Sequence, residues 1–291
     1  QNMQIPESEL ILNADGSIYH LNILPEQLAQ TVITVGDPDR VEDITKHFDS
    51  VDVKVRKREF HTQTGKCNGK FITVISTGIG TDNIDIVFNE LDALANIDLK
   101  TREIKAEKTA LDIIRVGTSG AIQEDIPIDS FLVSELGIGF DTLLHYYDSK
   151  HLQHLNLSKS LTQQLELSEE KSHPYIVSAD PELLKTLDST KLIKGITATN
   201  VGFYAPQGRV LRAGLSDVNF MQKLKNARLD ARKITNLEME TAGIYGMASL
   251  LGHRAVSLNA ILANRANGEF SKSPKDTVDN LILYTLEKLT H

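Results

Sequence analysis

The sequence of 291 residues has a single cysteine, Cys67, and no apolar run approaching the length of a membrane-spanning helix. One thiol can neither form an intrachain disulfide nor build a zinc site. A helix that crosses a bilayer needs about 20 mostly apolar residues. The first ten residues, QNMQIPESEL, are polar and lack the apolar centre of a signal peptide. We therefore expect a reduced, cytoplasmic protein without a membrane partner.

The charge of the chain is also one-sided, with a formal net charge of -8 at pH 7. An acidic chain has no general attraction for nucleic acid or for an anionic membrane surface. Hydrophobic residues make up 41% and charged residues 24%, which is ordinary for a globular protein and argues against disorder. Any bound anion must therefore be held by locally placed arginines.

Short apolar segments alternate with amphipathic segments along the whole chain. This alternation predicts an α/β fold, a single domain over residues 1–291 with a central, mixed and mostly parallel sheet flanked by helices. The predicted strands are 31–35, 51–60, 70–77, 112–118, 130–136, 192–200, 234–238 and 255–264. The predicted helices are 37–48, 81–94, 216–227, 240–251 and 274–290.

Three local features complete the predicted organisation. The GKCNGK segment (65–70) is typical of a turn, and we expect it to pair the strand 51–60 with the strand 70–77. Residues 95–111 are highly charged and are interpreted as a surface excursion. Residues 142–175 are polar and rich in His, and their pattern predicts no definite element.

Arginines and glycines gather where predicted strands end, which is where ligands bind in open α/β sheets. In VGDPDR, Gly36 permits a close backbone approach and Arg40 lies in the first turn of a predicted helix, a good position for phosphate. Arg115 lies inside an apolar strand, where a charge is costly unless an anion or a carboxylate meets it. Gly117, Thr118 and Gly120 are then predicted to form a turn. A capped helix with a surface arginine is the alternative interpretation of VGDPDR, and no GxGxxG supports a dinucleotide site.

Two further segments carry groups suited to a nucleoside. GFYAPQGR (202–209) places the Gln207 amide two residues before the Arg209 guanidinium, and such a pair can contact the O2, N3–H and O4 edge of uracil. Phe203 offers a ring face. NLEMETAG (236–243) ends a strand with Glu238, Met239 and Glu240, whose carboxylates suit a sugar diol or acid–base work. A polar loop and an acidic helix start are the respective alternatives.

Taken in order, the motifs GDPDR, REF, STGIG, RVGTSGAIQ, FYAPQGR, EMET and ANR resemble the uridine phosphorylases of the nucleoside phosphorylase-I family. The resemblance runs from His20 to the final helix. FYxxQxR together with EMExA is its most specific part, because purine-cleaving relatives lack the Gln–Arg pair. Where those relatives carry an Asp, this chain has Asn264. The resemblance implies reversible phosphorolysis of uridine to uracil and ribose 1-phosphate.

The resemblance also implies a role for individual residues. It assigns phosphate to Gly36, Arg40, Arg115 and Thr118, with Arg58 reaching the phosphate of a neighbouring subunit. It assigns uracil to Gln207 and Arg209, with Phe203 packing on the nucleoside and Arg265 holding the base loop. It assigns the ribose to Met239 and Glu240, with His20 contacting the 5′-hydroxyl across a dimer interface. Residues 266–274 are expected to form a lid.

Two consequences concern partners. The implied assembly is a homodimer that forms a homohexamer of three dimers. No cofactor is implied, since inorganic phosphate is a co-substrate, and no metal takes part in catalysis. The family's dimer-interface potassium site uses a Glu, an Ile carbonyl and a Ser; Glu59 and Ile79 match it, whereas Asn83 stands in place of the Ser.

Other functions remain open on the sequence. The first is a phosphorylase of the same fold for another nucleoside, either a purine nucleoside or deoxyuridine and thymidine. The second is a hydrolytic nucleosidase, against which the phosphate arginines Arg40 and Arg115 argue. The third is a non-catalytic nucleoside-binding protein, because a fold by itself does not imply activity.

Overall fold

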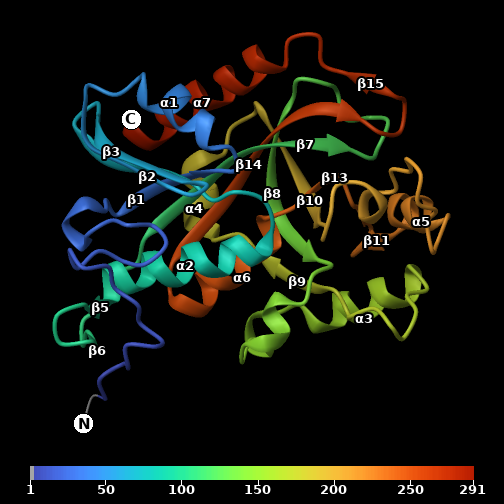
Figure 1. Cartoon of the computed structure of the whole chain (residues 1–291). Coiled ribbons are helices and arrows are strands. Elements are labelled where there is room, and N and C mark those ends of the chain that lie inside the picture. The colour runs from blue at the N-terminus through green and yellow to red at the C-terminus, as the bar shows by residue number, and fades with distance from the viewer. Residues whose placement is uncertain (1–2) are drawn as a thin grey trace.

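Eleven strands hydrogen bond into one mixed sheet in a computed structural model, which describes residues 3–291 (Figure 1). Their order is β15-β14-β8-β10-β13-β7-β1-β4-β3-β2, and β9 pairs with β8. The strands of this sheet are β1 (Thr31–Val35), β2 (Ser50–Lys57), β3 (Phe60–Cys67), β4 (Lys70–Ser76), β7 (Asp112–Ala121), β8 (Phe131–Gly139), β9 (Tyr175–Ser178), β10 (Leu192–Thr199), β13 (Asn236–Glu238), β14 (Arg254–Asn264) and β15 (Glu269–Phe270). Two small hairpins stand apart from it, β5 (Ile97–Asp98) with β6 (Glu103–Ile104), and β11 (Arg228–Leu229) with β12 (Arg232–Lys233).

The centre of the sheet is parallel and part of it closes on itself. β4, β1, β7 and β14 run parallel to one another. β14 also pairs with β8, and the path β8–β10–β13–β7 returns to β14, so these five strands form a closed ring. β13 is antiparallel to β7. The chain that leaves β13 therefore passes back alongside β7, which brings two distant segments of the sequence together.

Helices cover both faces of the sheet. They are α1 (Val41–Thr45), α2 (Thr81–Asn96), α3 (Leu155–Gln164), α4 (Pro181–Leu187), α5 (Phe220–Asn226), α6 (Thr241–Leu251) and α7 (Pro274–Thr290). α2 packs on α6, and α6 packs on β8, β10 and β14. α7 packs on β14 and β7 from the other side, where α1 also lies (Figure 1). No helix within residues 3–291 is long and apolar enough to cross a membrane.

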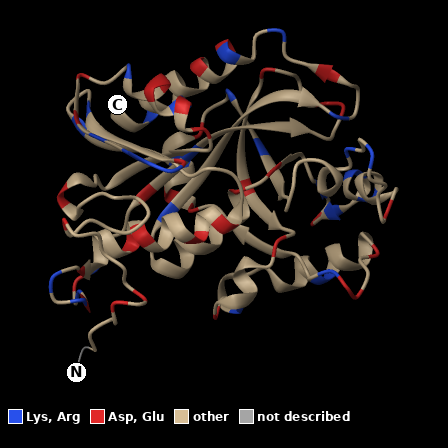
Figure 2. Ribbon diagram, in the orientation of Figure 1, with Lys and Arg blue, Asp and Glu red and all other residues tan. Residues whose placement is uncertain are grey.

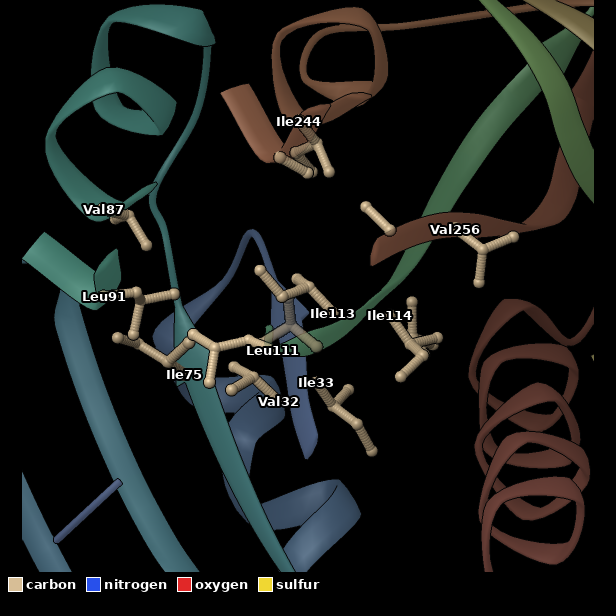
Figure 3. Packing of buried hydrophobic residues seen from close by; sticks show 14 of the residues in the cluster. Val32, Ile33, Ile75, Val87, Leu91, Leu111, Ile113, Ile114, Ile244 and Val256 are labelled. Carbon is tan, nitrogen blue, oxygen red and sulfur yellow. The ribbon is translucent and has the colours of Figure 1, made fainter. Parts of the chain in front are cut away.

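The core lies between the central strands and these helices. Val32 and Ile33 are neighbours on β1, as are Ile113 and Ile114 on β7, and all four are at most 1% exposed. Successive strand residues point to opposite faces, so both faces of these strands are buried, as in a parallel sheet covered on each side. Figure 3 shows Val32 and Ile113 meeting the side of α2, while Ile33 and Ile114 point away from it. Each such side chain contributes about 1.5–3 kcal/mol by burial.

The predicted pairing of 51–60 with 70–77 is wrong. A further strand, β3, lies between them and pairs with both β2 and β4. β2 ends at Lys57, and Arg58 turns the chain with a φ of 55°. β3 escaped prediction because its buried positions are polar. Thr64, for example, donates to the Gln27 carbonyl at 2.8 Å, and only tertiary partners of this kind make such burial favourable.

The predicted turn at Gly117, Thr118 and Gly120 is also wrong, because β7 continues to Ala121 with β14 on one side and β13 on the other. Gly117 has a packing reason instead. A Cβ at this position would lie 2.4 Å from the guanidinium of Arg115, which folds back over the glycine. The glycine therefore makes room for a buried arginine rather than for a turn.

The remaining predictions differ mainly in extent. The predicted helix 37–48 is a short 3₁₀ turn, Pro38–Arg40, followed by the five-residue α1. The predicted helix 216–227 shortens to α5, while the final helix, 274–290, agrees with α7. Residues 95–111 contain the β5–β6 hairpin and are largely exposed, as expected. Residues 142–175, for which no element was predicted, hold two 3₁₀ turns, Leu143–Tyr146 and Lys150–Leu152, then α3 and the start of β9.

Candidate active site

A cavity of about 820 Å³ lies at the ends of β1, β4, β7, β13 and β14. Its walls come from the segments after β1 and β4, the second half of β7, the loop after β10 and the segment after β13. Nine of the residues predicted for the site line it together: Gly36, Arg40, Arg115, Thr118, Phe203, Gln207, Arg209, Met239 and Glu240.

Arg115 is the most deeply buried cation among the residues that line this cavity. Charged residues lie mainly on the helices and loops around the sheet, and the strands are mostly free of them (Figure 2). Arg115 is 5% exposed. Its Nη2 lies 3.2 Å from Glu240 Oε1 and 3.5 Å from Glu238 Oε1. The sequence required either a ligand anion or a carboxylate opposite this arginine, and two carboxylates are present.

The other side of the guanidinium is held by β14. Arg115 Nη1 donates to Ser257 Oγ at 3.2 Å and to Asn259 Oδ1 at 3.0 Å. These two residues were not predicted for the site. Their signal in the sequence is the alternation of polar and apolar residues in AVSLNAIL, where Ser257 and Asn259 share one face of a buried strand. That face meets Arg115 because β14 and β7 are paired in parallel.

Glu238 fixes the backbone that presents Glu240. Its Oε1 accepts hydrogen bonds from the backbone N–H of Glu240 at 3.0 Å and of Thr241 at 2.6 Å, and from the Thr241 hydroxyl. Its Oε2 accepts from Thr199 Oγ1 at 2.7 Å. Glu240, in turn, accepts the backbone N–H of Gly80 at 2.9 Å with its Oε2. The start of α6 is thereby anchored to β10 and to the segment after β4.

The buried triad shifts the pKa of Arg115 and that of Glu240. Burial lowers the pKa of Arg115, but the charges of Glu238 and Glu240 raise it more, so the arginine stays protonated. Burial raises the pKa of Glu240 above its ordinary value, and the charge of Glu238 adds to this, while Arg115 opposes it. Glu240 is therefore more readily protonated than a carboxyl group in water.

Arg40 differs from Arg115 in having an unengaged guanidinium. It follows Pro38 in the 3₁₀ turn that Asp37 caps by accepting the N–H of Asp39. Its side chain lines the cavity and forms no hydrogen bond with any residue from 3 to 291. Burial lowers its pKa, and the nearby charge of Arg115 lowers it further, against the opposing effect of Asp37. A half-buried arginine without a partner in the described chain, beside a second arginine, calls for an anion.

The loop after β10 presents the Gln207 and Arg209 side chains as one unit. Arg209 Nη1 donates to Gln207 Oε1 at 2.8 Å and to the Phe203 carbonyl at 2.8 Å. Gln207 Nε2 donates to the Gly202 carbonyl at 3.1 Å. The guanidinium of Arg209 lies over the Phe203 ring, 3.9 Å from its centroid. Gln207 still has one N–H and one carbonyl lone pair free for a ligand.

The strand end at β14 supports this loop. Arg265 does not line the cavity, but its Nη1 donates to the backbone carbonyl of Gln207 at 2.9 Å. Asn264 is 1% exposed, and its Nδ2 donates to the carbonyls of Gln123 and Ile126, while its Oδ1 accepts the N–H of Ala266. All of these partners are backbone groups, so Asn264 has a structural role and does not face a base. In the segment 266–274, Phe270 on β15 lines the cavity and is 64% exposed.

Two predicted residues lie away from this cavity. Arg58 is exposed at the turn between β2 and β3. His20 Nδ1 lies 2.5 Å from Glu90 Oε2, and its backbone N–H donates to the same carboxylate. Neither lines the cavity of its own chain. The structure therefore gives these two residues no role at the site of the subunit that carries them.

The residues considered for potassium lie together on the cavity wall. Glu59, Ile79 and Asn83 all line it. Asn83 Nδ2 donates to Glu59 Oε2 at 3.1 Å, so an amide N–H faces this carboxylate where the family pattern has a hydroxyl oxygen. Within residues 3–291 no three His, Cys, Asp or Glu side chains are grouped as metal ligands.

Comparison with known proteins identifies the family. Residues 30–284 match the model of the phosphorylase superfamily, so the chain belongs to that family. A uridine phosphorylase from Thermococcus kodakarensis is 31% identical over 262 residues, which are 89% of this chain and 82% of the relative. The uridine phosphorylase of Escherichia coli is 27% identical, covering 93% of this chain and 96% of its own.

Two further relatives show that overall similarity does not distinguish relatives named for different bases. A crystal structure of a Trypanosoma brucei nucleoside phosphorylase, described as showing uridine phosphorylase activity, matches with a TM-score of 0.86 and 28% identity, over 96% of this chain and 99% of that chain. A DeoD-type purine nucleoside phosphorylase from Buchnera aphidicola is 26% identical, over 93% of this chain and 98% of its own. Relatives with different bases are thus similarly distant, and the residues around the cavity must distinguish them.

The buried triad generates a prediction about stability. Replacing Arg115 by Ala leaves Glu238 and Glu240 buried without their cation, which costs about 3–5 kcal/mol in the free energy of unfolding. Arg40→Ala is the matched control, because this arginine has no partner in the described chain, and its change is expected within about 0.5 kcal/mol. Urea denaturation followed by circular dichroism measures both. Equal stability of the two variants would contradict the structural role of Arg115.

Proposed function

We infer that this protein is a uridine phosphorylase, a pentosyltransferase that cleaves uridine with inorganic phosphate to uracil and ribose 1-phosphate. The observation that carries this inference is the arrangement of one cavity. Its walls hold unengaged Arg40 beside Arg115, the carboxylate of Glu240, and the Gln207–Arg209 pair. These are the groups that an anion, a ribose and a uracil edge need.

Phosphate binds at the arginine end of the cavity. Arg40 supplies an unpaired guanidinium, and Arg115 supplies a fixed cation that is already desolvated. Thr118 adds a hydroxyl and Gly36 lets the backbone approach closely. Guanidinium groups match the geometry of phosphate oxygens with paired hydrogen bonds. The net charge of -8 does not oppose this binding decisively, because the local field of two arginines acts at contact distance.

The ribose binds between the two ends. Glu240 accepts hydrogen bonds from the 2′- and 3′-hydroxyls, and Met239 packs against the sugar. Glu240 Oε1 lies 3.2 Å from Arg115 Nη2, so the carboxylate that binds the ribose is next to the guanidinium that binds the phosphate. The attacking phosphate oxygen and C1′ are thereby aligned by two side chains in direct contact, which supplies the proximity that a two-substrate reaction requires.

Uracil binds at the loop after β10. The free carbonyl lone pair of Gln207 accepts the N3–H of the base, and its free amide N–H donates to a ring carbonyl. Arg209 donates to the other carbonyl while it stacks on Phe203. Arg265 stabilises this arrangement through its hydrogen bond to the backbone carbonyl of Gln207.

The chemistry follows from where charge develops. As the C1′–N1 bond breaks, positive charge grows on the ribose ring and negative charge spreads over N1, O2 and O4 of uracil. Gln207 and Arg209 bind the leaving base more strongly as this charge grows, which is transition-state stabilisation. A phosphate oxygen then bonds to C1′ and forms ribose 1-phosphate, and the proton of hydrogen phosphate passes through solvent to N1 of the departing uracil. No covalent enzyme intermediate and no metal is required.

The purine alternative is disfavoured by a specific side chain. A purine-cleaving relative needs a group that protonates the leaving purine, and this chain has Asn264 at that position. All three hydrogen bonds of Asn264 go to backbone groups outside the cavity. Deoxyuridine and thymidine remain substrates to be tested, because the groups that contact uracil also fit thymine.

The wider setting of the enzyme is also part of this proposal. A neighbouring subunit supplies Arg58 to the phosphate and His20 to the 5′-hydroxyl, in a dimer that assembles to a hexamer. Arg58 is exposed and does not line the cavity of its own chain, which supports this arrangement. The enzyme acts in the cytoplasm in pyrimidine salvage. An Asn83 amide N–H that donates to Glu59, where the family pattern has a hydroxyl oxygen, disfavours potassium at Glu59 and Ile79.

Phosphate dependence is the first test of this function. Uracil release from uridine should require phosphate, and Arg40→Ala should remove a charge-assisted contact worth about 1.5–3 kcal/mol. This energy corresponds to roughly ten- to more than a hundredfold in kcat/KM for phosphate, because about 1.4 kcal/mol is a factor of ten. The measurement is initial rate against phosphate concentration. Uracil release that continues without phosphate would identify a nucleosidase instead.

Base selectivity is the second test. A site that hydrogen bonds one base edge rejects bases that lack it by as much as about 10⁴-fold, since its buried polar groups are left unpaired. Uridine should far exceed inosine, adenosine and cytidine, the last because its 4-amino group donates where uracil O4 accepts. Gln207→Ala should lower kcat/KM for uridine and leave the KM for phosphate nearly unchanged. If inosine matched uridine under the same conditions, the uracil assignment would be lost while the phosphate site stood.

Subunit complementation tests the assembly. Arg58→Ala damages only the contribution to a neighbour, whereas Arg40→Ala damages the chain's own site. Random mixing of the two variants gives heterodimers with one intact site, so about a quarter of wild-type activity should return in a two-fold dimer. Mixing Arg40→Ala with Gln207→Ala is the control, because both act in the same site and no intact site forms. A mixture of the first pair that stays inactive would contradict the shared site.

A further inference from the structure

A second cavity, of about 560 Å³, lies behind the loop that carries Gln207 and Arg209. Its walls are the ends of four segments: residues 140–142 after β8, residues 167–172 after α3, residues 200–206 after β10 and residues 214–220 before α5. It shares no lining residue with the first cavity. α3 and α5 mark this part of the molecule, away from α2 and the β2–β4 meander (Figure 1).

The inner wall of this second cavity is aromatic and aliphatic. The rings of Phe140 and Phe220 meet edge to face with centroids 5.6 Å apart. Leu167, Leu215 and Val201 add aliphatic surface. A mainly apolar cavity of several hundred Å³ with a few polar groups is typical of small-molecule sites, and ring walls favour a flat aromatic ligand.

One buried polar group in this wall has no protein partner for its acceptor. Asn200 is 3% exposed and lines the cavity. Its Nδ2 donates to the Ala198 carbonyl at 3.2 Å and to the Glu238 carbonyl at 3.4 Å. Its Oδ1 accepts no hydrogen bond from any residue between 3 and 291. An acceptor that is open to the cavity suits a ligand that brings an N–H or O–H donor.

The charges at the rim do not favour an anionic ligand. Lys171 lies over the Phe220 ring, 5.5 Å from its centroid, and is the one cation that lines the cavity. Glu170 and Asp217 are the two carboxylates there, and Asp217 also pairs with Lys223 at 3.2 Å. The rim therefore carries no excess of positive charge for an anion. Its cation instead suits the face of an aromatic ring.

We propose that this second cavity binds an uncharged, planar aromatic molecule with an N–H or O–H donor, and that its occupation strengthens uridine binding. The coupling follows from the shared loop. Val201, Ala205 and Pro206 line the second cavity, while Gln207 and Arg209 line the first. The Gly202 carbonyl, between these two sets, accepts from Gln207 Nε2. A ligand behind the loop restrains it in the conformation that presents the Gln207–Arg209 pair.

The strand that carries the ribose groups is coupled in the same way. The backbone N–H of Asn200 donates to the Glu238 carbonyl at 2.8 Å, and its side chain approaches the same oxygen. Glu238 directly precedes Met239 and Glu240. A ligand on Asn200 Oδ1 therefore steadies both the base loop and the end of β13. Binding at the second cavity stands on the geometry alone, whereas the effect on uridine rests on the proposed function.

The probe for this site is N-phenyl-1-naphthylamine, which is uncharged, has two aromatic groups and one N–H, and fluoresces in apolar surroundings. The full chain is titrated with uracil and phosphate present, so that the first cavity is filled. Saturable binding is expected. Gly214→Trp should weaken it at least about tenfold, because Gly214 lines the cavity, a Cβ there meets no atom within 4 Å, and its φ lies outside the left-handed region.

Two variants complete the binding experiment. Gly214→Ala is the matched control and should bind the probe as the unaltered chain does. Asn200→Leu keeps the size of the side chain and removes the acceptor, so it should weaken probe binding several-fold. Circular dichroism confirms the fold of each variant. Probe fluorescence that does not saturate, that is displaced by further uracil, or that is unchanged in both Gly214→Trp and Asn200→Leu would overturn the proposed site.

The coupling is measured separately. At a saturating probe concentration the KM for uridine should fall at least about twofold, with the KM for phosphate unchanged, because only the base and ribose contacts are restrained. Gly214→Ala should show the same response, and Gly214→Trp none. An unchanged KM for uridine would overturn the coupling. If the chain did not cleave uridine at all, the proposed function would fail while the probe titration still decided the second site.

Discussion

The ion-pair network of Arg115 with Glu238 and Glu240 is the constraint on which this site depends. A guanidinium on a buried strand is stable only when charge and hydrogen bonds surround it, and here β7, β13 and β14 each contribute. β13 reaches Arg115 because it runs antiparallel to β7 inside a closed ring of strands. The buried charge of Arg115 is therefore stable only with this topology of the sheet.

This network also orders the chemistry of the cavity. Glu240 forms an ion pair with Arg115, so the proposed ribose-binding carboxylate and the proposed phosphate-binding guanidinium cannot move independently. Arg40, which has no partner in the described chain, is left free to take an incoming anion. The base end is built separately, on a loop whose own hydrogen bonds leave half of the Gln207 amide for uracil. Changes at the base loop can therefore alter specificity without dismantling the phosphate site, as expected in a family with several bases.

The same loop has two sides. Its inner side faces the proposed uracil site, and its outer side closes a second cavity that contains the free Asn200 oxygen. A loop of this kind transmits small displacements because its backbone carbonyls at Gly202 and Phe203 position the side chains of Gln207 and Arg209. Loops on a rigid sheet commonly carry function for this reason.

The sequence by itself determined the α/β class, the family resemblance and nine of the residues that line the site. These follow from local signals: apolar periodicity, and glycine and arginine at strand ends. The tertiary structure decided what those signals cannot carry. β3 is hidden in the sequence because its buried positions are polar, and Thr64 among them is satisfied only by a distant partner, the Gln27 carbonyl. The prediction of a turn at Gly117 is wrong because a glycine is needed there to leave room for the Arg115 side chain, which folds back over it. Ser257, Asn259 and the ring of strands that brings them to Arg115 depend on contacts more than 100 residues apart, which no local pattern encodes.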